Sequence, residues 1–161
     1  MKTLFTILLA ALCVGSKAQA DTTSYWNYSD KINEMTHDHA YYAETSDNTH
    51  KVTTTLTVRH EKGKTEALLS VDHAVLNFQP VVFDGMVFNT LTFKAKFDDG
   101  KIETWHATPS SDESFDVGFI KAPGGFIKKL KKSKVAFIEV EVYGDGIYTF
   151  KFNTKNLVWN Y

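Results

Sequence analysis

The sequence is poor in cysteine and proline, with one cysteine and three prolines among 161 residues. The cysteine, Cys13, lies in the apolar stretch near the start of the chain, so residues 21–161 contain none. Disulfide bonds therefore cannot stabilise this part of the chain, and a packed hydrophobic core must do so. An excess of charge of one sign is also lacking, because 18 basic residues face 19 acidic ones. This balance argues against nucleic acid as a partner.

Long apolar runs are absent from the sequence after the first twenty residues. The one such run, Leu4–Val14, is eleven residues long, whereas a membrane-spanning helix needs about twenty. It follows Lys2 and precedes a polar stretch that ends in Ala20, which is typical of a secretory signal peptide. We therefore expect residues 1–20 to be a signal peptide that is cleaved near Ala20. The remainder should have no transmembrane segment and should be periplasmic or secreted.

Residues 21–161 have the length of one domain, and no stretch rich in proline, glycine or serine divides them. Their main pattern is an alternation of apolar and polar side chains. In residues 52–60, for example, Leu56 and Val58 share one face and threonines occupy the other. A period of two is typical of a half-buried β-strand. The sequence thus predicts a single β-rich domain over residues 21–161.

Turn signals separate these alternating segments. The clearest are Asp98-Asp99-Gly100 and Gly144-Asp145-Gly146, because glycine and aspartate supply the positive φ angles that tight hairpins require. We expect an all-β fold, an antiparallel β-sandwich of about eight or nine strands, with a small barrel as the alternative. The expected strands are residues 40–45, 52–60, 66–71, 81–88, 91–97, 102–108, 115–120, 136–142 and 148–152.

One segment shows a helical pattern instead. Residues 124–133 follow Pro123 and place Phe126, Ile127 and Leu130 on one face, with lysines on the opposite face. We expect one short helix there. A dense lysine cluster attracts phosphate groups, polyanions or an acidic partner, although its alternative role is to keep the outer face of the helix solvated. The candidate binding lysines are Lys128, Lys129, Lys131, Lys132 and Lys134.

Aromatic residues gather near the start of the predicted mature chain. Exposed tyrosine and tryptophan rings stack on sugars or anchor protein interfaces, and Trp26 and Tyr28 are the candidates for this role. The alternative is that such rings pack in the core or along a sheet edge. As the partner we expect a protein or a glycan of the cell envelope. Further aromatic residues are Tyr25, Tyr41, Tyr42, Trp105, Trp159 and Tyr161.

The sequence shows one weak candidate for a metal site and none for catalysis. His37 and His39 are separated by one residue, which would place both imidazoles on one side of a strand, but a turn before a strand explains the pair adequately. A Gly-x-Ser-x-Gly signature is missing, and the acidic pairs Asp98-Asp99 and Asp112-Glu113 lie in a predicted turn and loop. We therefore expect no enzyme activity, no cofactor and no metal.

Several motifs resemble those of small periplasmic proteins of Gram-negative bacteria. Tyr25-Trp26-Asn27-Tyr28 comes first, Phe97-Asp98-Asp99-Gly100 lies in the middle, and residues 126–134 precede the final hairpin. In this order the chain resembles the invasion-associated locus B proteins and the periplasmic accessory proteins of type VI secretion of the VasI/TagO kind. The shared positions are turns, core residues and the helix. The resemblance therefore implies a periplasmic β-sandwich and transfers no catalytic residue.

Three functions are compatible with these observations. The leading hypothesis is a non-enzymatic binding or accessory protein of the cell envelope, associated with secretion or host interaction, that uses the lysine helix or the neighbouring aromatics. A second is an immunity or inhibitor protein against an envelope-degrading enzyme, with the polar segment Ser110–Ser114 as its inserting loop. A third is a small-ligand carrier, which would need an empty apolar cavity.

Overall fold

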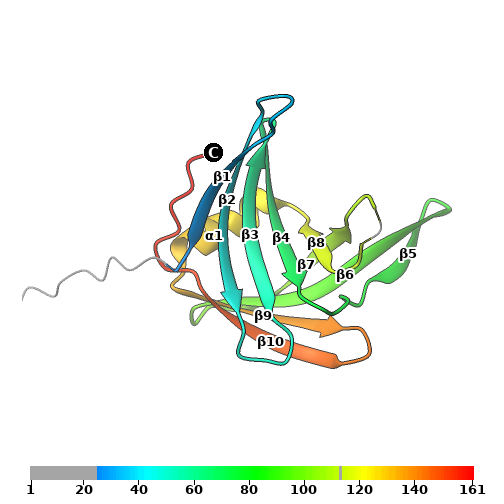
Figure 1. The fold of residues 1–161 in the computed structure, drawn as a ribbon. Helices are drawn as coiled ribbons and strands as arrows, with labels where there is room; N and C mark the ends of the chain where they lie inside the picture. Colours follow the sequence, from blue (N-terminus) through cyan, green and yellow to red (C-terminus); the bar gives the residue numbers. More distant parts are fainter. Residues whose placement is uncertain (1–24, 113) are drawn as a thin grey trace, which may run out of the picture.

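The computed structural model describes residues 25–112 and 114–161 (Figure 1). The predicted signal peptide, including Cys13, and Glu113 of the predicted loop lie outside the described residues. The described chain consists mainly of antiparallel strands with one short helix, which confirms the all-β prediction. Its elements are β1 (Asn27–Ile32), β2 (His39–Asp47), β3 (Thr54–Glu61), β4 (Lys64–Val71), β5 (Gln79–Phe83), β6 (Met86–Phe97), β7 (Ile102–Pro109), β8 (Val117–Ile120), α1 (Pro123–Lys132), β9 (Val135–Val142) and β10 (Gly146–Asn153).

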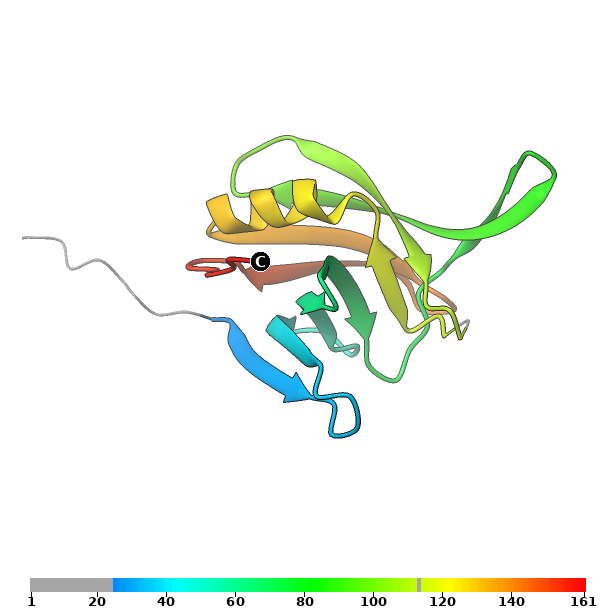
Figure 2. The same ribbon diagram turned by 90° about the horizontal axis from the view of Figure 1, so that it is seen from above.

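The strands form one continuous sheet in the order β1-β2-β3-β4-β8-β7-β6-β9-β10, and β5 pairs with β6. The short strand β8 joins the two parts of the sheet, because it pairs with β4 on one side and with β7 on the other. The sheet bends so that side chains from β2, β3 and β4 share one hydrophobic core with side chains from β6, β9 and β10 (Figure 2). The fold is therefore sandwich-like, with two layers that stay connected through β8.

The outer edge of β10 is capped by side chains from the end of β2 and the loop that follows it. As an edge strand, β10 leaves backbone groups without a neighbouring strand. The Asp47 carboxylate accepts a hydrogen bond from the Lys151 amide at 2.6 Å. The ring nitrogen Nε2 of His50 lies 3.0 Å from the carbonyl oxygen of Thr149. These contacts fasten the first part of the sheet to its last strand.

Two strands differ from the sequence-based expectation. The prediction of one strand over residues 81–88 is wrong, because Asp84 and Gly85 form a turn there with φ angles of 49° and 75°. The segment is instead the end of β5, this turn and the start of β6. Strand β1 was not predicted, because all six of its residues are exposed and so no apolar alternation marks it.

The helix α1 begins at Pro123 and ends at Lys132, close to the predicted residues 124–133. Proline suits the first helical turn, because its missing N–H would have no intrahelical acceptor there. The buried side of the helix carries Phe126, Ile127 and Leu130, as the pattern predicts. Within the described ranges, no helix has the length and apolar character that a membrane crossing requires.

After β10 the chain continues as a C-terminal tail, residues 154–161, which lies between β1 and α1 (Figure 2). The indole N–H of Trp26 donates to the Thr154 carbonyl at 3.2 Å and so ties the start of the described chain to the start of the tail. Leu157 and Trp159 of the tail are buried. The tail is thus packed onto the fold and brings the last residues of the chain to the first two strands.

Candidate binding site

The C-terminal tail forms one wall of an open groove with a volume of about 480 Å³, and strands β1 and β2 form the opposite wall. We call this space the aromatic groove. Rings dominate its lining, and a few polar groups lie among them, which is the usual composition of a small-molecule site. The aromatic residues are Tyr28, Tyr41, Tyr42, Trp159 and Tyr161, and the polar residues are Ser29, Asp30 and Asn160.

The strand register places a row of four side chains beneath the tail. Asp30 of β1 is opposite Tyr41 of β2, Tyr41 is opposite His60 of β3, and His60 is opposite Thr65 of β4. Directly opposed residues lie on the same face of a sheet, so the four form a cross-strand row. The ring of Tyr161 rests on this row, with its centroid 4.6 Å from that of Tyr41 and 4.8 Å from that of His60.

Two hydrogen bonds hold the tail in this position. The Val158 amide donates to the Tyr28 hydroxyl oxygen at 2.9 Å, which ties the tail to β1. The ammonium group of Lys131 donates to the Trp159 carbonyl at 2.6 Å, which ties the tail to α1. Tyr161 follows directly and meets the Trp159 ring edge-on at 5.2 Å. The groove is therefore largely preformed, which reduces the entropy that a ligand loses on binding.

The indole of Trp159 is a buried donor without an acceptor. Only 4% of this residue is exposed, and its Nε1 has no hydrogen-bond partner among the described residues. A buried N–H without an acceptor costs free energy, and native proteins satisfy nearly all such groups. The Nε1 atom is itself buried, so Trp159 lines the aromatic groove with other atoms of its side chain or backbone.

The polar side of the aromatic groove is organised around Asp30. Its Oδ2 lies 3.0 Å from Nδ1 of His39, which begins β2. Desolvation raises the pKa of the Tyr41 hydroxyl above its ordinary value, and the charges of Asp30 and Tyr161 raise it further. A tyrosine is protonated at neutral pH even at its ordinary pKa, and the upward shift extends this state to higher pH, so the Tyr41 hydroxyl is available as a hydrogen-bond donor.

A second groove, with a volume of about 530 Å³, lies where the tail meets α1, and we call it the lysine groove. Trp159 and Tyr161 line both grooves. Thr65, the last member of the cross-strand row, also lines the lysine groove. The two spaces therefore adjoin, and the tail separates them. The lysines that line the second groove are Lys128, Lys131 and Lys132.

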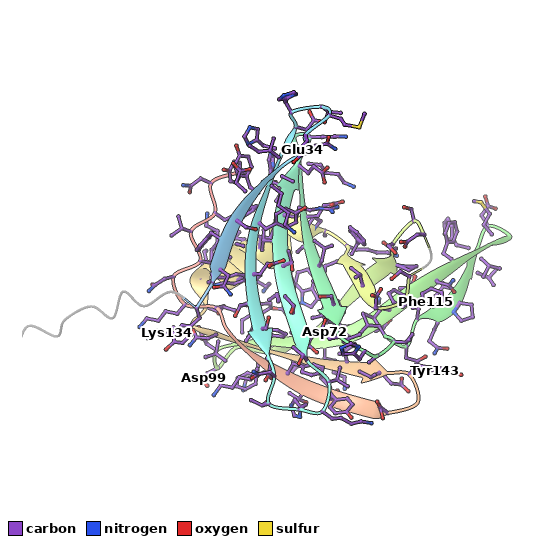
Figure 3. The ribbon with its side chains drawn as sticks, in the orientation of Figure 1. Glu34, Asp72, Asp99, Phe115, Lys134 and Tyr143 are labelled. Carbon is purple, nitrogen blue, oxygen red and sulfur yellow. The ribbon has the colours of Figure 1, made fainter. Side chains whose placement is uncertain are left out.

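The five predicted lysines do not gather into one surface. Lys129 turns to β7 and pairs with Glu103 at 2.6 Å. Lys134 comes after the helix, beside Asp98 and Asp99 of the β6–β7 turn (Figure 3). Successive residues of a helix point in directions about 100° apart, so a run of lysines spreads over several neighbours. The lysine groove receives the three residues that face the tail.

Of the two predicted aromatic residues, only Tyr28 lies at the surface. It lines the aromatic groove and is 48% exposed. Trp26 is 4% exposed and belongs to the hydrophobic core, where its indole N–H is bonded to Thr154. The expectation that Trp26 contacts a partner is therefore corrected, because the large ring contributes more by packing than it would at the surface.

The histidine pair does not share a strand face. His37 lies in the turn between β1 and β2, which also carries Glu34 (Figure 3), and has a positive φ of 58°. His39 begins β2 and pairs with Asp30. The alternation of a strand does not extend back to residue 37, so the two imidazoles share no strand face. The interpretation of the pair as a turn before a strand is confirmed. Among the described residues, no group of three or more histidine, cysteine, aspartate or glutamate side chains is placed to hold a metal ion.

No protein-family model, curated protein or solved structure matches the chain. The resemblance to the invasion-associated locus B and type VI accessory proteins therefore stays a prediction. The inhibitor loop expected at Ser110–Ser114 also stays a prediction, since it includes residue 113, which lies outside the described residues. The geometry of the two grooves is the basis on which a function is inferred.

Proposed function

We propose that the chain is an exported, non-enzymatic binding protein of the cell envelope and that its ligand is an acidic saccharide chain. The observation that supports this proposal is the pair of grooves that adjoin at Trp159 and Tyr161. One groove offers aromatic rings and the other offers lysine ammonium groups. A ligand that spans the tail would therefore meet a stacking surface and a cationic surface side by side.

The aromatic groove suits sugar rings. The apolar C–H face of a sugar packs on an aromatic ring, while its hydroxyl groups need donors and acceptors at the ring edge. Ser29, Asp30 and Asn160 supply such groups beside the tyrosines. The groove thus combines the two kinds of contact that a saccharide requires.

The lysine groove suits the acidic substituents of such a chain. Lys128 and Lys132 are exposed, and within the described chain neither forms an ion pair. Because Tyr161 borders both grooves, a sugar stacked on this ring would bring a carboxylate or phosphate group near the two lysines. Long-range attraction between these charges would also speed the encounter with an acidic polymer.

The chemistry of the grooves favours binding over hydrolysis. Most glycosidases use two carboxyl groups, one on each side of the bond that they cleave. Among the described residues that line the two grooves, Asp30 carries the one side-chain carboxylate. This carboxylate is already paired with His39 at 3.0 Å. These observations support a protein that holds a saccharide without cleaving it.

Calorimetric titration of the purified protein with soluble peptidoglycan fragments and with acidic oligosaccharides of lipopolysaccharide tests the proposal. We expect Tyr161→Ala to weaken binding about 10- to 100-fold, because the ring shared by both grooves is lost. We expect Lys128→Glu to weaken binding of an acidic saccharide about 3- to 10-fold. Binding of a neutral saccharide should not respond to this charge reversal.

Two matched variants serve as controls for this titration. Tyr143→Ala removes an exposed tyrosine outside both grooves (Figure 3), and Lys101→Glu reverses an exposed lysine in the β6–β7 turn. Neither should change saccharide affinity. The proposal would have to be abandoned if no saccharide released or absorbed heat, or if Tyr143→Ala weakened binding as much as Tyr161→Ala.

A further inference from the structure

A two-stranded arm projects from the fold (Figures 1 and 2). We define the arm as residues 79–90, in which β5 pairs with the first part of β6. The pairing of β6 with β7 begins only at Leu91, and its pairing with β9 begins at Lys94. The arm is therefore held to the body at its base, through the continuation of β6 and through the residues before β5, where the Asn77 amide donates to the Glu141 carbonyl at 3.0 Å.

The arm exposes large apolar side chains on both of its faces. The opposed pairs Val81–Phe88 and Phe83–Met86 lie on one face, which we call the aromatic face of the arm. The pair Val82–Val87 lies on the other face. Apolar clusters of this kind on a soluble protein mark an interaction site. The exposed fractions are Val81 48%, Val82 69%, Phe83 72%, Met86 56%, Val87 65% and Phe88 45%.

We propose that the aromatic face of the arm packs against the same face of a second copy of the chain, across a twofold axis. In such a twofold contact both copies use the same patch, so the assembly ends at two copies. The four side chains hold roughly 400 Å² of exposed apolar surface per copy, and with the backbone two copies approach roughly 1,000 Å², the lower limit of a specific interface. The area therefore fits a dimer of modest affinity.

The charge of the arm favours a second copy over a lipid surface. Between His73 and Lys94 the one charged side chain is Asp84, at the tip turn. Insertion of the arm into a bilayer would carry this carboxylate deepest into the hydrocarbon, which is unfavourable, and the arm has no lysine or arginine to attract anionic lipids. When two arms pack face to face, Asp84 stays at the end of the contact and in water.

The edge of β5 is a poor template for a strand of another protein. Pro80 lies in this strand and has no N–H to donate to an added strand. The apolar faces are therefore better suited to form the contact than the edge. The arm shares no residue with the aromatic or lysine groove, so this inference is independent of the proposed function. A dimer would present two saccharide sites, which raises the avidity for a polymer.

Sedimentation equilibrium of the full chain, at concentrations up to roughly 200 µM, tests the dimer. We expect a reversible monomer–dimer equilibrium. Phe83→Asp should raise the dissociation constant about 30-fold or more, because it buries a charge in the aromatic face. Val82→Asp is the matched control on the opposite face and should change the constant less than about 3-fold. Thermal unfolding should be similar for both variants, since neither residue belongs to the core.

Three results would overturn the inference. The first is a chain that stays monomeric up to the highest concentration. The second is an equal weakening of the dimer by Phe83→Asp and Val82→Asp, which would mean that the aromatic face is not the contact. The third is a monomer that sediments with vesicles of phosphatidylethanolamine and phosphatidylglycerol and loses this binding in Phe83→Asp, which would assign the arm to the membrane instead.

Discussion

Replacing Phe126 with alanine is expected to lower the free energy of unfolding by about 3–5 kcal/mol. The Phe126 ring is fully buried and meets the rings of Trp105, Phe97 and Phe93 edge-on, with centroids 5.0, 5.5 and 6.2 Å away. Alanine would remove these contacts and leave a cavity between α1 and the sheet, because close-packed neighbours fill a vacated space only in part. Urea denaturation followed by circular dichroism measures the loss.

Two further variants calibrate this measurement. Tyr143→Ala removes a ring that is 71% exposed, and its effect should stay within about 0.5 kcal/mol. Phe126→Leu keeps part of the buried volume and should cost less than the alanine variant, about 1–2 kcal/mol. If Phe126→Ala lowered the free energy of unfolding by less than about 1 kcal/mol, this result would contradict the packing of α1 against the sheet. It would also undermine the lysine groove, which depends on that position of the helix.

Replacing Asp47 with alanine is expected to lower the free energy of unfolding by about 2–4 kcal/mol. Asp47 is 3% exposed, and its carboxylate accepts hydrogen bonds from the Thr49 amide at 2.9 Å, the Thr49 hydroxyl at 2.7 Å and the Lys151 amide at 2.6 Å. Without the carboxylate these donors lose their acceptor, and the end of β2 loses one of its contacts with the edge of β10 while the His50 contact with Thr149 remains. The same denaturation experiment measures this effect.

Asp47 also makes the stability depend on pH. Burial alone would raise the pKa of Asp47, but the hydrogen bonds from Thr49 and Lys151 outweigh burial and hold the pKa below its ordinary value. Because the folded pKa lies below the unfolded value of about 3.9, the stabilisation is complete above that pH and is lost as the pH falls through the folded pKa. The free-energy difference between the natural chain and Asp47→Asn should stay constant down to about pH 5 and shrink below about pH 4.

Asp145→Asn is the matched control for the acid-dependent effect. Asp145 is an exposed carboxylate that pairs with Lys51 at 3.2 Å, and exposed ion pairs contribute about 1 kcal/mol or less. Its replacement should therefore change the unfolding free energy little at any pH. If Asp47→Asn and Asp145→Asn gave the same small loss, the capping of β10 by Asp47 would not stabilise the fold.

Local signals predicted the hairpins and the helix, because turn and helix preferences act over a few residues. In the predicted Gly144-Asp145-Gly146 turn, the two glycines have φ angles of 76° and 97°. The helix α1 begins at Pro123, one residue before its predicted start. The error at residues 81–88 has a physical origin as well. Apolar and polar residues alternate along a strand only where one face is buried and the other is exposed to water. The arm is apolar on both faces, so alternation does not mark its two strands. The Asp84-Gly85 pair was the local signal that could have identified the turn.

From the sequence alone, the period of two, the turn residues and the helical spacing were sufficient to predict an all-β fold with one lysine-rich helix. Which side chains meet was decided by the tertiary structure. Tyr161 stacks on Tyr41, although the two residues are far apart in the sequence. Lys129 pairs with Glu103 and does not line the lysine groove. Such meetings depend on strand register and on the path of the tail. The packing of the whole core determines the strand register and the path of the tail, and the local preferences of single residues do not predict either of them.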